Sequence, residues 1–188
     1  MPAGLDEGAL AAGEPPAAGA EKVARAKAAS VAAVHPGHIV LAADTIVVLD
    51  GGVLGKPTDA EDARRMLCAL RDRWHLVATA VVLRSGSAGE GWVVESRVRM
   101  RAYTDSEITT YVASGGGEDK AGSYGVQDAP FHPVAAMDGC YCNVMGLPLW
   151  TTTQLLERVG YVVPRRPSEA YARCEDCPLA PGCAARGP

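Results

Sequence analysis

The sequence lacks an excess of basic residues and any long uninterrupted apolar run. Its 188 residues carry 18 Lys and Arg against 22 Asp and Glu, and the net charge of −4 argues against binding to nucleic acid by bulk charge. The best candidate for a membrane span, residues 39–49, is interrupted by Asp44 and falls short of the roughly 18 residues that a span needs. The first residues show neither a basic leader nor an apolar secretory segment. We therefore expect a cytoplasmic protein without a nucleic-acid or membrane partner.

The composition otherwise predicts one folded domain with loosely organised ends. Hydrophobic residues make up 48% and charged residues 21%, which is typical of soluble globular proteins of this length. Of the first 20 residues, 14 are Ala, Gly or Pro, a composition that predicts a loop or a disordered arm. The residues from 164 onward are rich in Pro, Arg and Cys and show no periodicity. We interpret 1–163 as the domain and 164–188 as an appendage.

Hydrophobic periodicity predicts alternating helices and strands between these ends. A helix is expected over 17–34, and its inward stripe includes Lys27. Capping boxes starting at Thr58 and Thr104 predict two further helices, and one more is expected near the end of the domain. We expect strands at 39–42, 45–49, 53–54, 75–83, 92–103, 132–137 and 141–144, and helices at 58–71, 104–113 and 147–159. This pattern predicts an α/β fold: a mixed, twisted sheet with helices packed on its faces.

Asp44 is a single carboxylate inside a run that otherwise predicts buried strands. It is either held by backbone donors at a bulge, or placed at the carboxyl end of a strand as a general base or metal ligand. Three lysines also stand in unusual places: Lys27 on an inward stripe, Lys56 in a Gly-Lys-Pro turn, and Lys120 in a glycine-rich loop. Each alone is more typical of a snorkelling or solvated side chain. Together with Asp44 they predict a site for a polyanion such as a triphosphate, with a metal ion.

Other residues that could carry chemistry give weaker signals. There is no GxxxxGK[ST] loop, so phosphates would not be cradled in the Walker manner. Gln127 follows the glycine-rich loop, and its amide either recognises a nucleobase edge or is an ordinary polar loop group. His75 begins a buried strand, and we interpret it as a core histidine. No Ser-His-Asp or Cys-His arrangement has local sequence support.

Six cysteines occur, at positions 68, 140, 142, 174, 177 and 183. Without a secretion signal they favour thiols or metal ligation over a disulfide framework. Cys174, Cys177 and Cys183 have a spacing that can ligate zinc or an iron–sulfur cluster, with a fourth ligand from Cys140 or Cys142. The alternative is free thiols on a loose tail. The first cysteine, on the 58–71 helix, is predicted to be a small core residue.

Five short motifs follow one another in order along most of the chain. They are Ala43-Asp44-Thr45-Ile46-Val47, Gly55-Lys56-Pro57, His75-x-Val77-x-Thr79, Asp119-Lys120-Ala121-Gly122-Ser123-Tyr124-Gly125-Val126-Gln127 and Asn143-Val144-Met145-Gly146-Leu147-Pro148-Leu149. In this order they resemble the Maf family of nucleoside triphosphate pyrophosphatases. The resemblance implies a Maf/ITPase-like fold, hydrolysis of dTTP or UTP to the monophosphate and pyrophosphate, a divalent cation (Mg²⁺ or Mn²⁺), and a homodimer.

The resemblance also implies roles for individual residues. Asp44 is similar to the family's proton acceptor, which activates water for attack on the α-phosphorus. Lys27 and Lys56 are similar to its phosphate-binding lysines. Glu7 is similar to the acidic residue that holds the metal together with Asp44.

The resemblance places Thr45 and Gln127 where the family selects the base. Lys120, in the glycine-rich loop, is also expected to bind substrate. The sequence departs from the family in having no Ser-x-Ser-Pro-Arg-Arg loop, and in Asp128, which adds negative charge near the expected anion. We therefore expect either a longer natural N-terminus or a shortened chain with weak activity. The alternative function is a catalytically impaired, nucleotide-binding or regulatory relative involved in division control.

Overall fold

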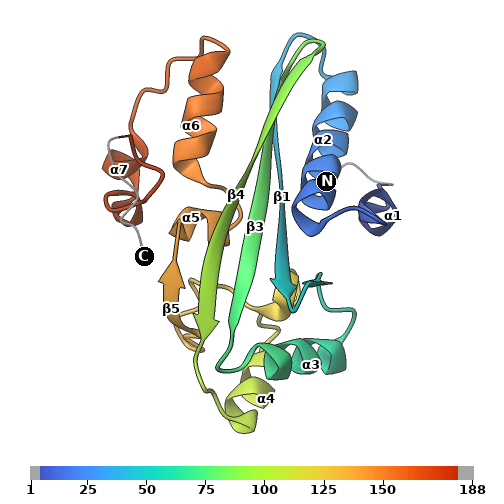
Figure 1. The fold of residues 1–188 in the computed structure, drawn as a ribbon, viewed down its shortest axis with the longest axis vertical. Coiled ribbons are helices and arrows are strands. Elements are labelled where there is room, and N and C mark those ends of the chain that lie inside the picture. The colour runs from blue at the N-terminus through green and yellow to red at the C-terminus, as the bar shows by residue number, and fades with distance from the viewer. Residues whose placement is uncertain (1–4, 182–188) are drawn as a thin grey trace.

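The computed structural model describes residues 5–181 and contains a five-strand sheet flanked by helices (Figure 1). Its elements are α1 (Glu7–Ala11), α2 (Pro16–Val34), β1 (Ile39–Leu49), β2 (Gly52–Leu54), α3 (Ala60–Leu70), β3 (Trp74–Ser85), β4 (Ala88–Met100), α4 (Asp105–Ala113), η1 (Ala121–Ser123), β5 (Val134–Asp138), α5 (Tyr141–Val144), α6 (Leu149–Arg158), α7 (Pro167–Ala170) and η2 (Ala172–Cys174). None of the helices in this part of the chain is long and apolar enough to cross a membrane.

The sheet has the order β2-β1-β3-β4-β5, and each of these neighbouring pairs is antiparallel. The α/β class with helices on the faces of the sheet is confirmed. The strands expected at 75–83 and 92–103 extend toward each other until only two residues separate β3 and β4, because both strands continue pairing to Ser85 and Ala88. The long strands β1, β3 and β4 form the spine of the molecule (Figure 1).

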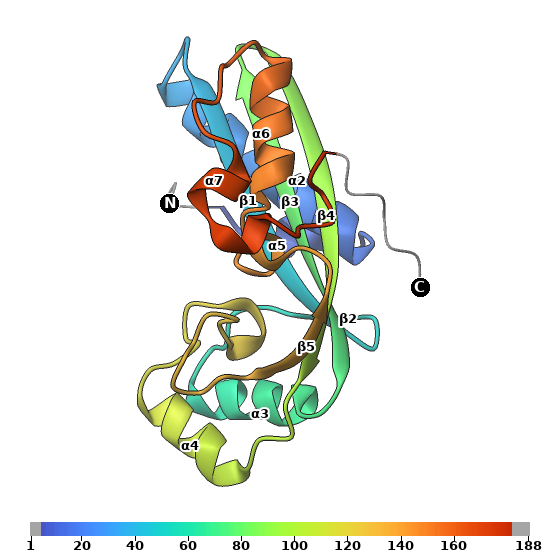
Figure 2. The same ribbon diagram turned by 90° about the vertical axis from the view of Figure 1, so that its left-hand side faces the viewer.

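Alternation along β3 explains how helices cover both faces of the sheet. Ala80 and Val82 pack in one apolar cluster with α2, whereas Val81 and Leu83 pack with Leu155 of α6. Successive side chains of a strand point to opposite faces, so α2 and α6 lie on opposite sides. Figure 2 shows α6 and α7 in front of the sheet and α3 and α4 at its other end.

The sequence prediction is accurate where apolar spacing and caps agree. The helix expected at 58–71 forms as α3, and its buried stripe consists of Ala63, Met66, Leu67 and Leu70. The Thr104 capping box is present, with both the side-chain and backbone halves formed. The first cap is displaced by one residue: Asp59, rather than Thr58, accepts the hydrogen bond from the helix, through the Asp62 N–H.

Three local predictions are wrong. Residues 39–49 form one continuous strand, because Asp44 pairs in register with Ala80 and needs no bulge. The Ala/Gly/Pro-rich start contains the helix α1, whose first turn Asp6 caps by accepting from Ala9 N at 2.9 Å. Residues 141–144 form a helical turn instead of a strand. The turn is followed closely by Gly146, whose φ is +103°. Four residues are too few for alternation to distinguish the two.

The division at residue 163 stays a prediction. The described part of the appendage contains only the short elements α7 and η2, so the absence of periodicity there reflects segments of three and four residues.

Candidate active site

A cavity of about 440 Å³ opens at the outer edge of β1. The short strand β2 pairs only with residues 47–49 of β1, so among the described residues the edge at 43–46 has no strand partner. Neighbouring side chains of a strand point to opposite faces of the sheet. Asp44 therefore lines the cavity on the face that α2 covers, and Thr45 lines it on the opposite face. Asp44 therefore lies in the middle of a strand at an open sheet edge, and not at a strand end as one of the two interpretations expected.

The cavity brings together seven residues that are far apart in the sequence. Every predicted catalytic, substrate-binding or divalent-cation residue of the domain lines it: Glu7, Lys27, Asp44, Thr45, Lys56, Lys120 and Gln127. They come from two helices, one strand and three loops, so the fold accounts for their convergence.

One lysine is held between two carboxylates at the centre of the site. Lys27 Nζ lies 2.7 Å from Asp44 Oδ1 and 2.8 Å from Glu7 Oε1. Only 14% of the Lys27 side chain and 12% of the Asp44 side chain are exposed, against 39% for Glu7. The inward position of Lys27 on α2 is thus explained by the carboxylates that it meets.

Burial and this ion pair shift the pKa values of Asp44 and Lys27 in opposite directions. Burial raises the pKa of Asp44 above its ordinary value, and the hydrogen bond from Lys27 offsets only part of the rise. Burial lowers the pKa of Lys27, but hydrogen bonds to Asp44 and Glu7 outweigh it and leave the pKa raised. Lys27 therefore remains a cation, while Asp44 takes up a proton more readily than an exposed aspartate.

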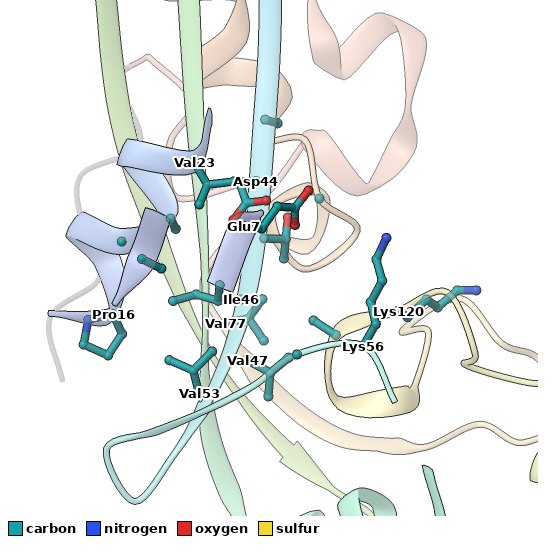
Figure 3. A pocket seen from close by; sticks show the side chains of 18 of the residues that line it. Glu7, Pro16, Val23, Asp44, Ile46, Val47, Val53, Lys56, Val77 and Lys120 are labelled. Carbon is teal, nitrogen blue, oxygen red and sulfur yellow. The ribbon is translucent and has the colours of Figure 1, made fainter. Parts of the chain in front are cut away.

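The other two lysines stand on loops across from the carboxylates. Figure 3 shows the carboxylates of Glu7 and Asp44 side by side, with Lys56 and Lys120 extending from loops beyond them. A backbone hydrogen bond of 3.0 Å from Gly122 N to Gly55 O joins the two loops. Lys120 is paired at 2.5 Å with the exposed carboxylate of Asp119, so its ammonium sits at the mouth of the cavity.

Gly122 brings the Lys120 loop close to the sheet. Its φ is +70°, a backbone conformation that residues with a side chain rarely adopt. A Cβ on Gly122 would also stand only 3.2 Å from the side chain of Val47, so the close approach of loop and strand requires glycine here.

A buried chain of hydrogen bonds that sequence reasoning missed supports Thr45. Thr79 Oγ1 donates to the carbonyl oxygen of Asn143 at 2.9 Å and lies 2.9 Å from Thr45 Oγ1. Because a hydroxyl has one proton, Thr45 must donate to Thr79, and its oxygen then offers only lone pairs to the cavity. Asn143 is fully buried and also donates to Val77 O and Ser96 Oγ. The sequence offered one signal of this chain, because Thr79 is a polar residue within an otherwise apolar strand.

The loop that carries Gln127 is held by Asp128. Asp128 does not line the cavity; its carboxylate accepts hydrogen bonds from the Tyr111 hydroxyl and from Gly125 N. These hydrogen bonds close the turn from Gly125 to Asp128, which contains Gln127. The interpretation of His75 as a core histidine is confirmed: it is buried, its Nε2 lies 2.7 Å from the Tyr124 hydroxyl, and burial lowers its pKa to about 4.

One of the cysteine predictions is wrong, and another stays a prediction. Cys68 is exposed and not in the core, because it lies off the buried stripe of α3. Cys183 lies outside the described residues, so the expected set with Cys174 and Cys177 stays a prediction. Within residues 5–181, no group of three or more histidine, cysteine or acidic side chains is already arranged around a metal position.

Comparison with known proteins agrees with the motifs that line the cavity. The family model described as Maf-like protein matches residues 1–159. The chain belongs to the Maf family. It is 47% identical over 184 residues to the dTTP/UTP pyrophosphatase of Thermomicrobium roseum, covering 96% of this chain and 83% of that protein. It is 46% identical over 162 residues to a protein of the same name from Syntrophomonas wolfei (85% of each chain), and 47% identical over 157 residues to one from Myxococcus xanthus (84% and 80%).

Proposed function

We propose that this Maf-family chain hydrolyses dTTP and UTP to the nucleoside monophosphate and pyrophosphate by attack of water on the α-phosphorus. The observation that carries the proposal is the Asp44–Lys27–Glu7 arrangement in a cavity that Lys56 and Lys120 also line. A carboxylate beside several cations suits a reaction in which water is deprotonated while negative charge grows on phosphate. The names of the related proteins indicate the substrates.

Asp44 is the proposed base. Lys27 contacts Oδ1, and Oδ2 has no hydrogen-bond donor among the described residues, so Oδ2 can accept a proton from water. A base is more effective when its pKa lies nearer the working pH, and burial moves the pKa of Asp44 in that direction.

The lysines are the proposed phosphate ligands. Lys27 lies next to the attacking position, and Lys56 and Lys120 reach the cavity from the joined loops. Lys120 would exchange its exposed partner Asp119 for a phosphate oxygen, which costs little because an exposed ion pair contributes only about 0–1 kcal/mol. A lysine carries a single compact charge on a flexible side chain, so it can stay with a phosphate oxygen while the pyrophosphate leaves.

Glu7 and Asp44 are the proposed ligands of a divalent cation, Mg²⁺ or Mn²⁺. Their carboxylates already share one positive group, since the Lys27 ammonium lies within 2.8 Å of both. Two carboxylates together with substrate phosphates are a usual donor set for Mg²⁺. The ion would supply charge to offset that of the triphosphate. With the ion bound, Lys27 would turn from the carboxylates toward phosphate.

Thr45 and Gln127 are the proposed base-selecting residues. The lone pairs of Thr45 Oγ1 suit an N–H donor such as N3–H of uracil or thymine, whereas N3 of cytosine carries no proton to donate. A Cβ on Gly146 would stand 3.2 Å from Thr45 Oγ1, so glycine keeps this approach open. Homodimer formation stays a prediction.

The test is product analysis with purified protein, dTTP or UTP, and Mg²⁺ or Mn²⁺. We expect pyrophosphate and monophosphate in equal amounts, and slower turnover of dCTP than of dTTP. Release of orthophosphate instead would contradict the proposed cleavage position. No arginine lines the cavity in the described residues. Nucleotide binding without turnover would therefore favour the alternative, an impaired nucleotide-binding relative.

A further inference from the structure

Four cysteines from two distant parts of the sequence form one buried cluster. Cys140 and Cys142 stand at the start of α5, and Cys174 and Cys177 belong to the C-terminal segment. All four are at most 3% exposed and belong to one packed cluster. Cys142 Sγ lies 3.3 Å from Cys174 Sγ, and Cys140 and Cys177 pack in the same cluster. The α5 region and the C-terminal segment therefore meet at these cysteines.

The spacing of these cysteines is that of paired metal ligands. Cys174 and Cys177 are separated by two residues, as is usual in tetrahedral zinc sites, and Cys140 and Cys142 by one. Two short pairs brought together by folding can provide four thiolates, a donor set that selects soft metals over Mg²⁺ or Mn²⁺.

The segment that carries Cys174 and Cys177 has no core of its own. Its regular elements are a four-residue helix and a three-residue helix, α7 and η2, which are too short to bury an independent apolar core. It is fastened at the cluster, where Trp150 Nε1 of α6 also donates to Cys174 O at 3.1 Å. Small segments without a core are commonly held by a metal ion or by disulfides.

A cation stands at the edge of the cluster. The guanidinium of Arg173, which precedes Cys174, lies 4.9 Å from the ring centroid of Tyr141, which precedes Cys142. Four thiolates around a divalent ion carry a net charge of −2, and a nearby arginine offsets part of it.

We propose that Cys140, Cys142, Cys174 and Cys177 form a structural zinc site that fastens the C-terminal segment to α5. Binding would release the four thiol protons and leave zinc with four sulfur ligands and no open position, so the site is structural rather than catalytic. The sulfur atoms are not yet arranged around an ion position. A Zn–S distance of about 2.3 Å places sulfurs about 3.8 Å apart in a tetrahedron, so the 3.3 Å pair must separate by roughly half an ångström.

This set differs from the one predicted from spacing alone. It takes both Cys140 and Cys142 as ligands, and it does not require Cys183.

The first experiment measures metal content. The full chain is produced with added zinc, purified under reducing, oxygen-free conditions, and analysed by elemental mass spectrometry. We expect one zinc per chain. Cys174→Ser/Cys177→Ser should lower the zinc content by about tenfold or more, and the exposed-cysteine control Cys68→Ser should leave it unchanged.

A second experiment does not depend on the folding of a variant. The zinc-free wild-type chain is titrated with Co²⁺, and its visible spectrum is followed. Absorption of tetrahedral cobalt thiolate that saturates at one cobalt per chain supports the site. Wild-type protein without zinc and without that absorption overturns it, as does zinc that persists in the double variant. An iron–sulfur chromophore, or loss of four thiols to two disulfides in the reduced preparation, also overturns it.

Discussion

The substitution Asp44→Asn tests the proposed base with the smallest change of shape. The amide keeps an oxygen that can accept from Lys27, but it cannot take a proton from water. Positioned general bases contribute about 10²–10⁴ in rate, so we expect kcat/KM for dTTP to fall by about that factor.

We expect Asp44→Asn to change the free energy of unfolding far less than it changes the activity. Because burial raises the pKa of Asp44, the folded state holds the ionised carboxylate less favourably than the unfolded chain does. The amide removes this cost, while Lys27 loses a charged partner but keeps Glu7 at 2.8 Å. These two effects oppose each other, and we expect the free energy of unfolding to change by about 1 kcal/mol or less.

The assay follows pyrophosphate release from dTTP, and thermal unfolding is measured in parallel. Asp50→Asn is the matched control, because Asp50 is an exposed aspartate whose partner is Arg73 and which lies outside the cavity. The control should retain wild-type turnover. Wild-type turnover in Asp44→Asn would remove Asp44 from the mechanism, and a large loss of stability would show that its role is structural.

Two further predictions concern pH. Lys27 lowers the pKa of Asp44, so Lys27→Met should move the acid limb of the kcat/KM profile for dTTP to higher pH; a limb that does not move would contradict their coupling. Hydrogen bonds from Thr104 and Arg101 lower the pKa of Glu107 from 4.5 to about 2, so its stabilising contribution is complete above pH 4.5 and is lost as the pH falls toward 2. The difference in melting temperature between wild type and Glu107→Gln should therefore be constant near neutral pH and should shrink between pH 4.5 and 2, whereas a difference independent of pH would refute this linkage.

The elements that could be predicted are those in which several local signals agree. The α3 helix and the Thr104 capping box are encoded within a few residues, and the structure confirms both. The single-turn helix α5 could not be predicted, because its conformation depends on contacts such as that of buried Asn143 with Ser96 on β4. Helix α1 was obscured by its Ala- and Gly-rich composition, although Asp6 provided a cap.

The candidate site was predictable in its residues more than in its geometry. Lys27 and Asp44 stood out because charge on an apolar stripe or strand is costly, and the structure brings them into contact. The open edge of β1 and the chain from Thr45 through Thr79 depend on strand pairing and on a carbonyl from α5, which no local pattern encodes. The contact between Cys142 and Cys174 likewise depends on tertiary packing and could not be predicted from local sequence.

The central claim is that water attacks the α-phosphorus next to Asp44. Hydrolysis of dTTP in isotopically labelled water, followed by mass spectrometry of both products, tests it most directly. We predict that the heavy oxygen appears in dTMP and that the pyrophosphate remains unlabelled. Label in the pyrophosphate would place the attack on the β-phosphorus and would contradict the proposed mechanism.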